Sequence, residues 1–220
     1  MSPAQDGRLN VAVIGAGPVG SVLGQALASA GHKLLTSNSS DPAATIAEAD
    51  LVLFAIPSDQ IANTVNGYAK AGLFKPGQLI AHTAGEFGIE VLQPAVEQGV
   101  IPLAIHPAMT FTGTSIDLQR IRESYFGVAA PEVALPIAQA LVIEMGAEPI
   151  VISEEDRKVY FEAISVANNF SKLIVNQSIG LLESIGIEHA RVVLGPLIRS
   201  AVEEALSDGH TPINPEELLS

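Results

Sequence analysis

The chain has 220 residues, of which 48% are hydrophobic and 16% charged, and its formal net charge is −13. This composition is typical of one large or two small globular domains and excludes a largely disordered chain. The eleven Lys and Arg residues are scattered and cysteine is absent, which argues against a nucleic-acid surface, an anionic membrane surface, disulfides and a thiolate zinc site.

Neither a secretory signal nor a membrane span is expected. The N-terminus lacks a charged-then-apolar pattern, and the longest apolar run, "LVLFAIP" at 51–57, is too short to cross a bilayer. We therefore expect a cytoplasmic protein that contacts no membrane and no nucleic acid. The mean hydropathy of +0.35 is high for such a protein and suggests that a partner subunit covers part of its surface.

Short apolar strands alternate with helical stretches over residues 10–153. The predicted strands are 10–14, 32–37, the apolar run within 44–61, 77–85, 100–107, 124–130 and 147–153. The predicted helices between them are 21–31, a short one before the third strand, and 131–146. This alternation predicts an α/β fold of the Rossmann type, with a doubly wound, mostly parallel sheet.

The pattern changes at about residue 153. Residues 153–186 form one long helical pattern without proline, with Ser153 as the expected N-cap and Gly186 at the end, and a second helix is predicted over 188–208. The sequence therefore predicts two domains, a Rossmann domain over 1–152 and a small all-helical domain over 153–220.

Three glycines, Gly15, Gly17 and Gly20, form a G-x-G-x-x-G loop between the first predicted strand and a helix. In that context the first glycine allows a tight turn, the second lets the backbone approach a pyrophosphate, and the third permits close helix–strand packing. The phosphates would meet free N–H groups at the helix N-terminus. The loop therefore predicts a dinucleotide site in 1–152, although a tight turn without a ligand is the alternative. The residues expected to bind the cofactor are Gly15, Ala16, Gly17, Pro18, Val19, Gly20, Ser37, Asn38, Ser39, Ile56, Pro57, Ser58 and Thr83.

The end of the second predicted strand bears on the choice between NADP and NAD. NAD enzymes usually carry an acidic residue there, whereas this chain has small neutral residues, Ser37, Asn38 and Ser39. A 2′-phosphate would not be repelled, which favours NADP. No arginine lies in the segment and Asp41 follows it, so NAD stays open.

Two histidines follow neighbouring predicted strands. His82 ends the fourth and His106 the fifth, and ligands of such sheets bind beyond these carboxyl ends. We expect both beside the cofactor as catalytic candidates, with a structural hydrogen-bonding role as the alternative. A metal site is not predicted, because a third nearby ligand is missing.

Several stretches together resemble a known group of oxidoreductases. They are "VAVIGAGPVGSVLGQALASAGH", "ADLVLFAIPSDQI", "HTAGEFGIEVL", "IHPAMTF" and "DRKVYFEAISVANN". The chain resembles the Rossmann-like oxidoreductases grouped with 6-phosphogluconate dehydrogenase and pyrroline-5-carboxylate reductase, and more closely a bacterial subgroup whose C-terminal domain has no known function. The resemblance implies a nicotinamide cofactor, a helical domain that completes the substrate cleft, and a homodimer formed through these helices. The subgroup usually has Tyr-His-Ala-Ala before an asparagine. Here Phe161 replaces the histidine and Asn169 matches the asparagine.

A polar stripe lies on the long predicted helix. Asn169, Lys172 and Asn176 are spaced three and four apart and therefore share one face. The face is either the solvent side of an amphipathic helix or a catalytic face that closes over the nicotinamide. In the second case Lys172, partly buried, would protonate a carbonyl oxygen while Asn169 and Asn176 orient the substrate. Lys172 and Asn176 also form K-x-x-x-N, which resembles the catalytic pair of 3-hydroxyacid dehydrogenases and ketopantoate reductases.

Three functions stay open. The first is an NAD(P)-dependent oxidoreductase that transfers hydride between the cofactor and a small carbonyl or imine. The second is a non-catalytic dinucleotide-binding or redox-sensing protein, which the change at Phe161 favours. The third is a purely structural dimerisation protein, which tight cofactor binding would exclude.

Overall fold

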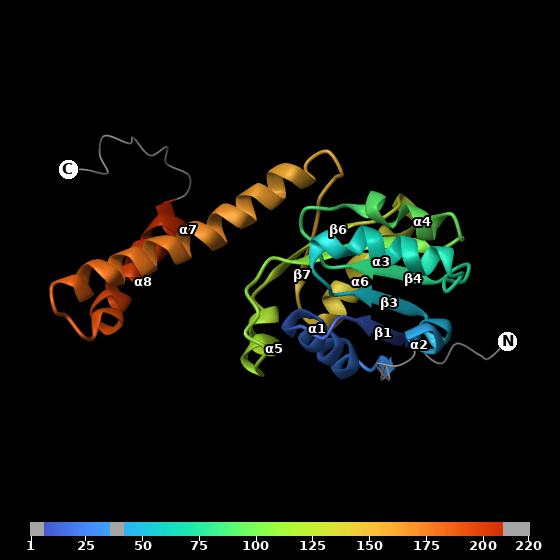
Figure 1. The fold of residues 1–220 in the computed structure, drawn as a ribbon, viewed down its shortest axis with the longest axis horizontal. Helices are drawn as coiled ribbons and strands as arrows, with labels where there is room; N and C mark the ends of the chain where they lie inside the picture. The colour runs from blue at the N-terminus through green and yellow to red at the C-terminus, as the bar shows by residue number, and fades with distance from the viewer. Residues whose placement is uncertain (1–6, 36–41, 209–220) are drawn as a thin grey trace. The chain divides into compact units, whose positions relative to one another are not determined.

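The computed structural model describes residues 7–35 and 42–208. In this part of the chain a seven-stranded sheet has the order β2-β1-β3-β4-β5-β6-β7 (Figure 1). The strands are β1 (Asn10–Ile14), β2 (Lys33–Leu35), β3 (Leu51–Phe54), β4 (Leu79–His82), β5 (Ile101–Pro107), β6 (Tyr125–Ala129) and β7 (Glu148–Val151). All neighbouring strands pair in parallel except β5 and β6, which are antiparallel. The predicted α/β fold with a mostly parallel sheet is confirmed.

Helices cover both faces of the sheet, as a doubly wound fold requires. They are α1 (Pro18–Ser29), α2 (Pro42–Glu48), α3 (Ser58–Lys70), η1 (Ile89–Leu92), α4 (Gln93–Val96), α5 (Ile116–Ile121), η2 (Glu132–Ala134) and α6 (Leu135–Met145). One core cluster packs α1, α5 and α6 against the sheet, and the other packs α2, α3 and α4. Each face therefore has its own apolar core.

Strand β3 shows how the sequence produces these two cores. Its side chains alternate, so that Leu51 and Leu53 belong to one cluster while Val52 and Phe54 belong to the other. All four residues are buried, as expected for a strand of a parallel sheet covered on both faces. Burial of each large side chain is worth roughly 1.5–3 kcal/mol. Apolar packing on both faces thus fixes the strand ends on which the candidate site lies.

Two long helices follow the sheet, α7 (Arg157–Ser184) and α8 (Ala190–Asp208). The hydroxyl of Ser153 accepts the backbone N–H of Asp156 at 3.1 Å in the turn before α7. The helix itself begins at Arg157 and not directly after Ser153, the predicted N-cap. Gly186, with φ of +87°, follows α7, and its N–H donates to the carbonyl of Glu183 at 3.0 Å. None of the described helices is both long and apolar enough to cross a membrane.

The chain divides into two compact units, with the division between Ile164 and Ser165. The first unit holds the sheet together with the first turns of α7, and the second holds the rest of α7 and α8. We call the second the helical unit. The domain boundary predicted at 152/153 falls in the loop between β7 and α7, ahead of this division.

Candidate functional site

The glycine loop joins β1 to α1 and has three distinct backbone environments. Gly15 has φ of +133°, and a Cβ there would overlap the carbonyl oxygen of Ala55. Gly20 packs so tightly that a Cβ would lie 3.0 Å from Val13 Cγ1 and 3.1 Å from the Cβ of Ala55. A Cβ on Gly17, by contrast, would meet no atom within 4 Å. The loop therefore has a tight turn at its first glycine, open space at its second, and close helix–strand contact at its third.

The N-terminus of α1 lies at the open side of this loop. Pro18 occupies its first turn and Gly17 its N-cap, where no side chain caps the free N–H groups. A cavity of about 250 Å³ borders this end of the helix. It is lined by Val13, Gly15, Ala16, Gly20, Ser21, Gln25, Leu34 and Leu35. Backbone N–H groups beside an open cavity form a site suited to an anion such as a pyrophosphate.

Of the other residues predicted to bind the cofactor, Ile56, Pro57, Ser58 and Thr83 lie within the described part of the chain. Ile56 approaches the loop, since its Cγ2 would lie 3.3 Å from a Cβ on Gly15, while Pro57 is the N-cap of α3 and Ser58 its first residue. Thr83 follows β4 and donates its backbone N–H to the carbonyl of Phe54 at 3.1 Å. These residues thus border the same strand ends as the glycine loop. Ser37, Asn38 and Ser39 lie outside the described residues.

His82 is fully buried at the end of β4. Its Nδ1 accepts the backbone N–H of Ala84 at 3.2 Å, and its Nε2 donates to the carbonyl of Gly88 at 2.7 Å. Burial, with smaller contributions from Arg157 and His106, lowers the pKa of His82 to about 4 despite the hydrogen bond to Gly88. The ring is therefore neutral at pH 7 and both nitrogens are bound to backbone. This geometry favours the structural alternative, in which His82 holds the turn after β4.

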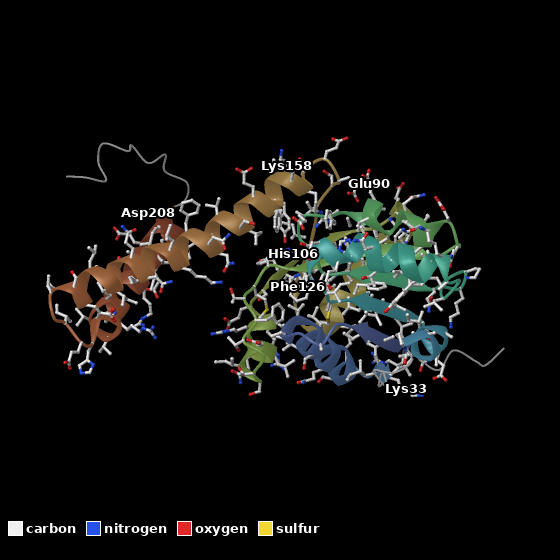
Figure 2. The ribbon with its side chains drawn as sticks, in the orientation of Figure 1. Lys33, Glu90, His106, Phe126, Lys158 and Asp208 are labelled. Atoms are coloured by element: carbon white, nitrogen blue, oxygen red, sulfur yellow. The ribbon has the colours of Figure 1, made fainter. Side chains whose placement is uncertain are left out.

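His106, labelled in Figure 2, lies at the end of β5. It pairs with Tyr160 from the first turns of α7. The His106 Nδ1 lies 2.8 Å from the Tyr160 hydroxyl, and the two rings meet edge to face with centroids 5.6 Å apart. The ring also lies against Gly85, where a Cβ would be 2.7 Å from Nε2. Burial and then the charge of Arg157 lower the pKa of His106 to about 4. His106 is thus neutral at pH 7, with a hydroxyl bound to Nδ1.

Tyr160 connects α7 to the sheet. A Cβ on Gly127 of β6 would lie 2.7 Å from the Tyr160 hydroxyl oxygen, so the phenol rests on the backbone of that strand. Burial raises the pKa of Tyr160, although the charge of Arg157 and a hydrogen bond from the Gly127 backbone oppose this. The phenol is therefore protonated at neutral pH and can donate to Nδ1 of His106.

Arg157, at the start of α7, is 2% exposed and lies beside the same pair. Its guanidinium carbon lies 5.7 Å from the centre of the Tyr160 ring, and Nη2 reaches the carbonyl of Ile152 at 3.5 Å. Its Nε and Nη1 are buried and have no hydrogen-bond partner. Burial lowers the pKa of Arg157, while Glu154 and Tyr160 raise it.

Glu154 lies in the turn before α7 and contacts the loop after β4. Its Oε1 accepts the backbone N–H of Ile89 at 2.7 Å, and a Cβ on Gly88 would overlap its carboxylate. None of the ion pairs found among the described residues involves Arg157. Glu154 therefore ties the start of α7 to the sheet but does not neutralise the arginine directly.

The polar stripe lies on the helical unit. Asn169, Lys172 and Asn176 are all exposed there, and the amide of Asn168 donates to the Oδ1 of Asn169 at 3.3 Å. The partial burial expected of Lys172 is not found within the single chain, because α7 is broadly exposed along this stretch. The structure brings His82 and His106 together at the sheet, and the stripe belongs to the other unit.

Sequence reasoning missed Arg157, Tyr160, Glu154 and the glycines on which the side chains rest. The signal available was the spacing of Arg157 and Tyr160, three residues apart on one helical face. A charged residue in the first turn of a helix usually faces water, so its burial could not be expected. Among the described residues no group of three or more acidic or histidine side chains could hold a metal ion.

Family models match most of the chain in two blocks. Residues 36–107 match the Rossmann-like domain, and residues 124–213 match a domain of unknown function, DUF2520. The chain combines a Rossmann-like domain with a DUF2520 domain. The predicted combination of a Rossmann-like domain with a C-terminal domain of unknown function is thereby confirmed. Among the curated proteins, none has a sequence that matches the chain significantly.

Solved structures of low sequence identity share the fold. One is a provisionally named NADP oxidoreductase from Bacteroides fragilis, 18% identical, with a TM-score of 0.68 over 90% of this chain and 80% of that chain. Another is the pyrroline carboxylate reductase of Plasmodium falciparum with NADP bound, 14% identical, with a TM-score of 0.62 over 96% and 82%. A third is a semialdehyde dehydrogenase NAD-binding protein from Cupriavidus necator in complex with calcium and NAD, 14% identical, with a TM-score of 0.64 over 95% and 87%.

Proposed function

We propose that the protein is an NAD(P)-dependent oxidoreductase that transfers hydride between a nicotinamide cofactor and a small carbonyl or imine. The observation that carries the proposal is the glycine loop. Gly15 and Gly20 admit no side chain, whereas Gly17 faces open space beside the uncapped N-terminus of α1. This is the arrangement that a pyrophosphate needs. The match to the Rossmann-like domain and the shared fold with NADP- and NAD-bound proteins support it.

The cofactor would be held by the residues of 1–152. The pyrophosphate would lie on the glycine loop and the nicotinamide half near Ile56, Pro57 and Thr83. When bound, the cofactor supplies the hydride that reduces the carbonyl or imine carbon and is itself oxidised. We propose NADP before NAD, because Ser37, Asn38 and Ser39 would not repel a 2′-phosphate.

The reacting oxygen or nitrogen must gain a proton as the carbon gains hydride. We assign that proton to Lys172, with Asn169 and Asn176 as hydrogen-bond donors that orient the substrate. Their position on one face of α7 supports this assignment. His106, with its Nδ1 bound to Tyr160, is the candidate from the sheet, and His82 is proposed to position the loop beside it.

The cofactor assignment is tested by Gly17→Ala. The φ of Gly17 is −79°, and a Cβ there meets no protein atom, so the variant should fold with unchanged stability. It should nevertheless bind NADPH at least tenfold more weakly, since the methyl group would occupy the pyrophosphate space. Gly67→Ala on α3, which also meets nothing within 4 Å, is the matched control. Equal NADPH affinity in all three proteins, measured by cofactor fluorescence, would contradict the assignment.

The catalytic assignment is tested by Lys172→Met. Oxidation of NADPH by a panel of small 2-oxo acids and cyclic imines is followed at 340 nm. Loss of a general acid should lower kcat about 10²- to 10⁴-fold and leave the NADPH affinity unchanged. Lys158→Met, at an exposed lysine on the same helix, should keep full activity. A fully active Lys172→Met enzyme would remove Lys172 from the mechanism.

A non-catalytic dinucleotide-binding or redox-sensing protein is the second candidate. The observation in its favour is Phe161, which follows Tyr160 and replaces the histidine of the resembling subgroup. NADPH binding without turnover across the whole substrate panel would favour this function. Detection of any cofactor oxidation that depends on a substrate would exclude it.

We also propose that two chains form a homodimer through the helices of 153–220. Large apolar side chains that a soluble chain would normally bury are exposed on both α7 and α8. They include Val166, Phe170, Leu173, Ile174, Leu181, Val192, Val193 and Leu197. Such a surface is typical of a protein–protein interface. A cytoplasmic location is part of the same proposal, and light scattering of the purified protein tests the oligomeric state.

A further inference from the structure

We propose that Arg157 binds a carboxylate group of the substrate, and that the reaction is therefore restricted to small oxo or imino acids. The inference deepens the proposed function and rests on it. It names a residue outside the polar stripe and the glycine loop, at the start of α7 beside Tyr160, which contacts His106 at the end of β5.

The guanidinium of Arg157 is buried and largely without hydrogen-bond partners. Arg157 is 2% exposed, yet two of its three nitrogens have no hydrogen-bond partner. Its one weak bond, from Nη2 to the carbonyl of Ile152, is 3.5 Å long. A buried cation without an anion is among the most costly arrangements in a protein. An arginine kept in such a position fits an anion that comes from outside the chain.

The second argument is the absence of an internal anion. The acidic side chain that acts on Arg157 is Glu154, which raises its pKa without forming an ion pair. One oxygen of Glu154 is held by the N–H of Ile89, and its carboxylate rests on Gly88. Glu154 is therefore bound to the loop after β4. No acidic side chain among the described residues forms an ion pair with Arg157.

The third argument is the chemistry around the guanidinium. Its charge lowers the pKa of both His82 and His106. Tyr160 covers one side of it and also binds His106 Nδ1. A carboxylate is planar and accepts two parallel N–H bonds, which matches the fork of an arginine. Because Nε and Nη1 have no exposed area, the ligand reaches them after a rotation of the guanidinium or of the Tyr160 ring.

A stability measurement separates this role from a structural one. If the guanidinium is uncompensated, Arg157→Met should have a Tm equal to or above that of the wild type, since an apolar side chain of similar length removes the buried charge. Arg122→Met, at an exposed arginine, serves as the control for loss of one charge. A Tm of Arg157→Met well below both other proteins means that the arginine is satisfied structurally, and this would overturn the inference.

A ligand measurement then tests the carboxylate directly. Acetate, pyruvate and oxalate are titrated into the NADPH-saturated protein, and thermal unfolding is compared with sodium chloride at equal ionic strength and with neutral pyruvamide. At least one carboxylate should stabilise the wild type and Arg122→Met, while pyruvamide should not. In Arg157→Met the half-effective concentration should rise about 30-fold or more. Glu154→Gln should lower it several-fold, because a competing negative charge is removed.

The outcomes separate this inference from the proposed function. NADPH that binds normally together with an unchanged carboxylate response in Arg157→Met overturns the role of Arg157 and leaves the oxidoreductase proposal standing. No response of the wild type to any of the three carboxylates also overturns it. A carboxylate response that depends on Arg157 in a protein that binds no dinucleotide supports the anion site and removes the oxidoreductase.

Discussion

Most apolar residues of the sheet are buried, whereas many are exposed along the two long helices. In the sheet unit every residue of β3 and β4 is buried, and the helices on both faces complete two cores. Along α7 and α8 the fully buried residues are Arg157 and Ala190, while side chains such as Leu173 and Leu197 are more than half exposed. The sheet unit therefore buries most of its apolar residues within one chain, whereas the described part of the helical unit leaves large apolar side chains exposed.

The difference shows what an apolar pattern can and cannot predict. Alternation along a strand identifies both faces, because the chain itself supplies the helices that cover them. A wide apolar arc on a helix indicates only that something covers it. For α7 the proposed cover is the same helices of a second subunit.

The largest effect should come from placing a glutamate in each unit. Leu53→Glu in the core of the sheet should prevent folding, since an unpaired charge there costs more than about 4 kcal/mol. Leu173→Glu on α7, where the side chain is 57% exposed, should leave the sheet unit folded and separate the proposed dimer into monomers. Light scattering and circular dichroism of both variants provide the measurement. A monomeric wild type, or a Leu173→Glu protein that stays dimeric, would refute the proposed interface.

A smaller effect concerns pH and the closed unit. The folded pKa of His82 is about 4, below the ordinary value of 6.5. Above pH 6.5 the ring is neutral in both states and its contribution is fully present. As the pH falls from 6.5 to 4 the unfolded state takes up the proton first, so stability is lost, on the order of 3 kcal/mol. His106 acts with the same sign.

The variant His82→Gln isolates that contribution. Urea unfolding between pH 7 and pH 4 should show a flatter pH dependence for His82→Gln than for the wild type. His189→Gln, at an exposed histidine of the helical unit, should follow the wild-type curve. If the slopes of His82→Gln and wild type coincide, the buried neutral ring does not govern the acid stability of the sheet.

Gly15→Ala should destabilise the sheet unit by roughly 1–3 kcal/mol, because its φ of +133° and its overlap with Ala55 both exclude a side chain. NADPH binding should be lost as well. Gly67→Ala in α3 has neither restriction. Its free energy of unfolding should rise by about 0.5–1 kcal/mol, because alanine loses less conformational freedom than glycine when the helix forms. Denaturant unfolding of both variants, run in parallel, gives the comparison. An unchanged free energy of unfolding for Gly15→Ala would mean that the turn shifts to accept the methyl group.

The smallest effect is expected for Tyr160→Phe, which removes the 2.8 Å hydrogen bond to His106. Stability should fall by about 1 kcal/mol, because Nδ1 of a half-buried ring loses its donor. Tyr125→Phe, at a tyrosine 60% exposed, should change nothing. A loss equal in both variants would show that the Tyr160 hydroxyl contributes no more than a solvated one.

The sequence predicts the sheet well because strand signals are local. The strand predicted at residues 10–14 has the observed bounds, and the order of the predicted strands and helices over 10–153 is correct. For residues 58–70 the sequence predicts only that they follow a turn, whereas they form α3. The apolar face of this helix is narrow, because polar residues lie between its buried apolar residues along the sequence. The antiparallel pairing of β5 with β6 could not be foreseen, because pairing depends on tertiary position.

The candidate site is predictable only in part. The glycine loop is a contiguous motif with a fixed geometry, so its turn and its packing follow from the letters alone. The histidines lie at the strand ends as predicted, but the partners that define their chemistry come from a residue 54 positions away or from loop backbone. The burial of Arg157 depends on how α7 leaves the sheet, which no local pattern encodes.

Gly85 and Gly88 bear on which amino-acid substitutions this protein can accept. Neither is a glycine of positive φ, so backbone strain gives no reason to keep them. A methyl group at residue 85 would push against the His106 ring, and one at residue 88 against the Glu154 carboxylate. In a saturation mutagenesis experiment residue 85 should therefore reject even alanine, whereas residue 88 should accept it once the exposed Glu154 carboxylate moves aside. A compensating change at residue 106 would rescue residue 85, which no second site can do for a glycine held by its own φ.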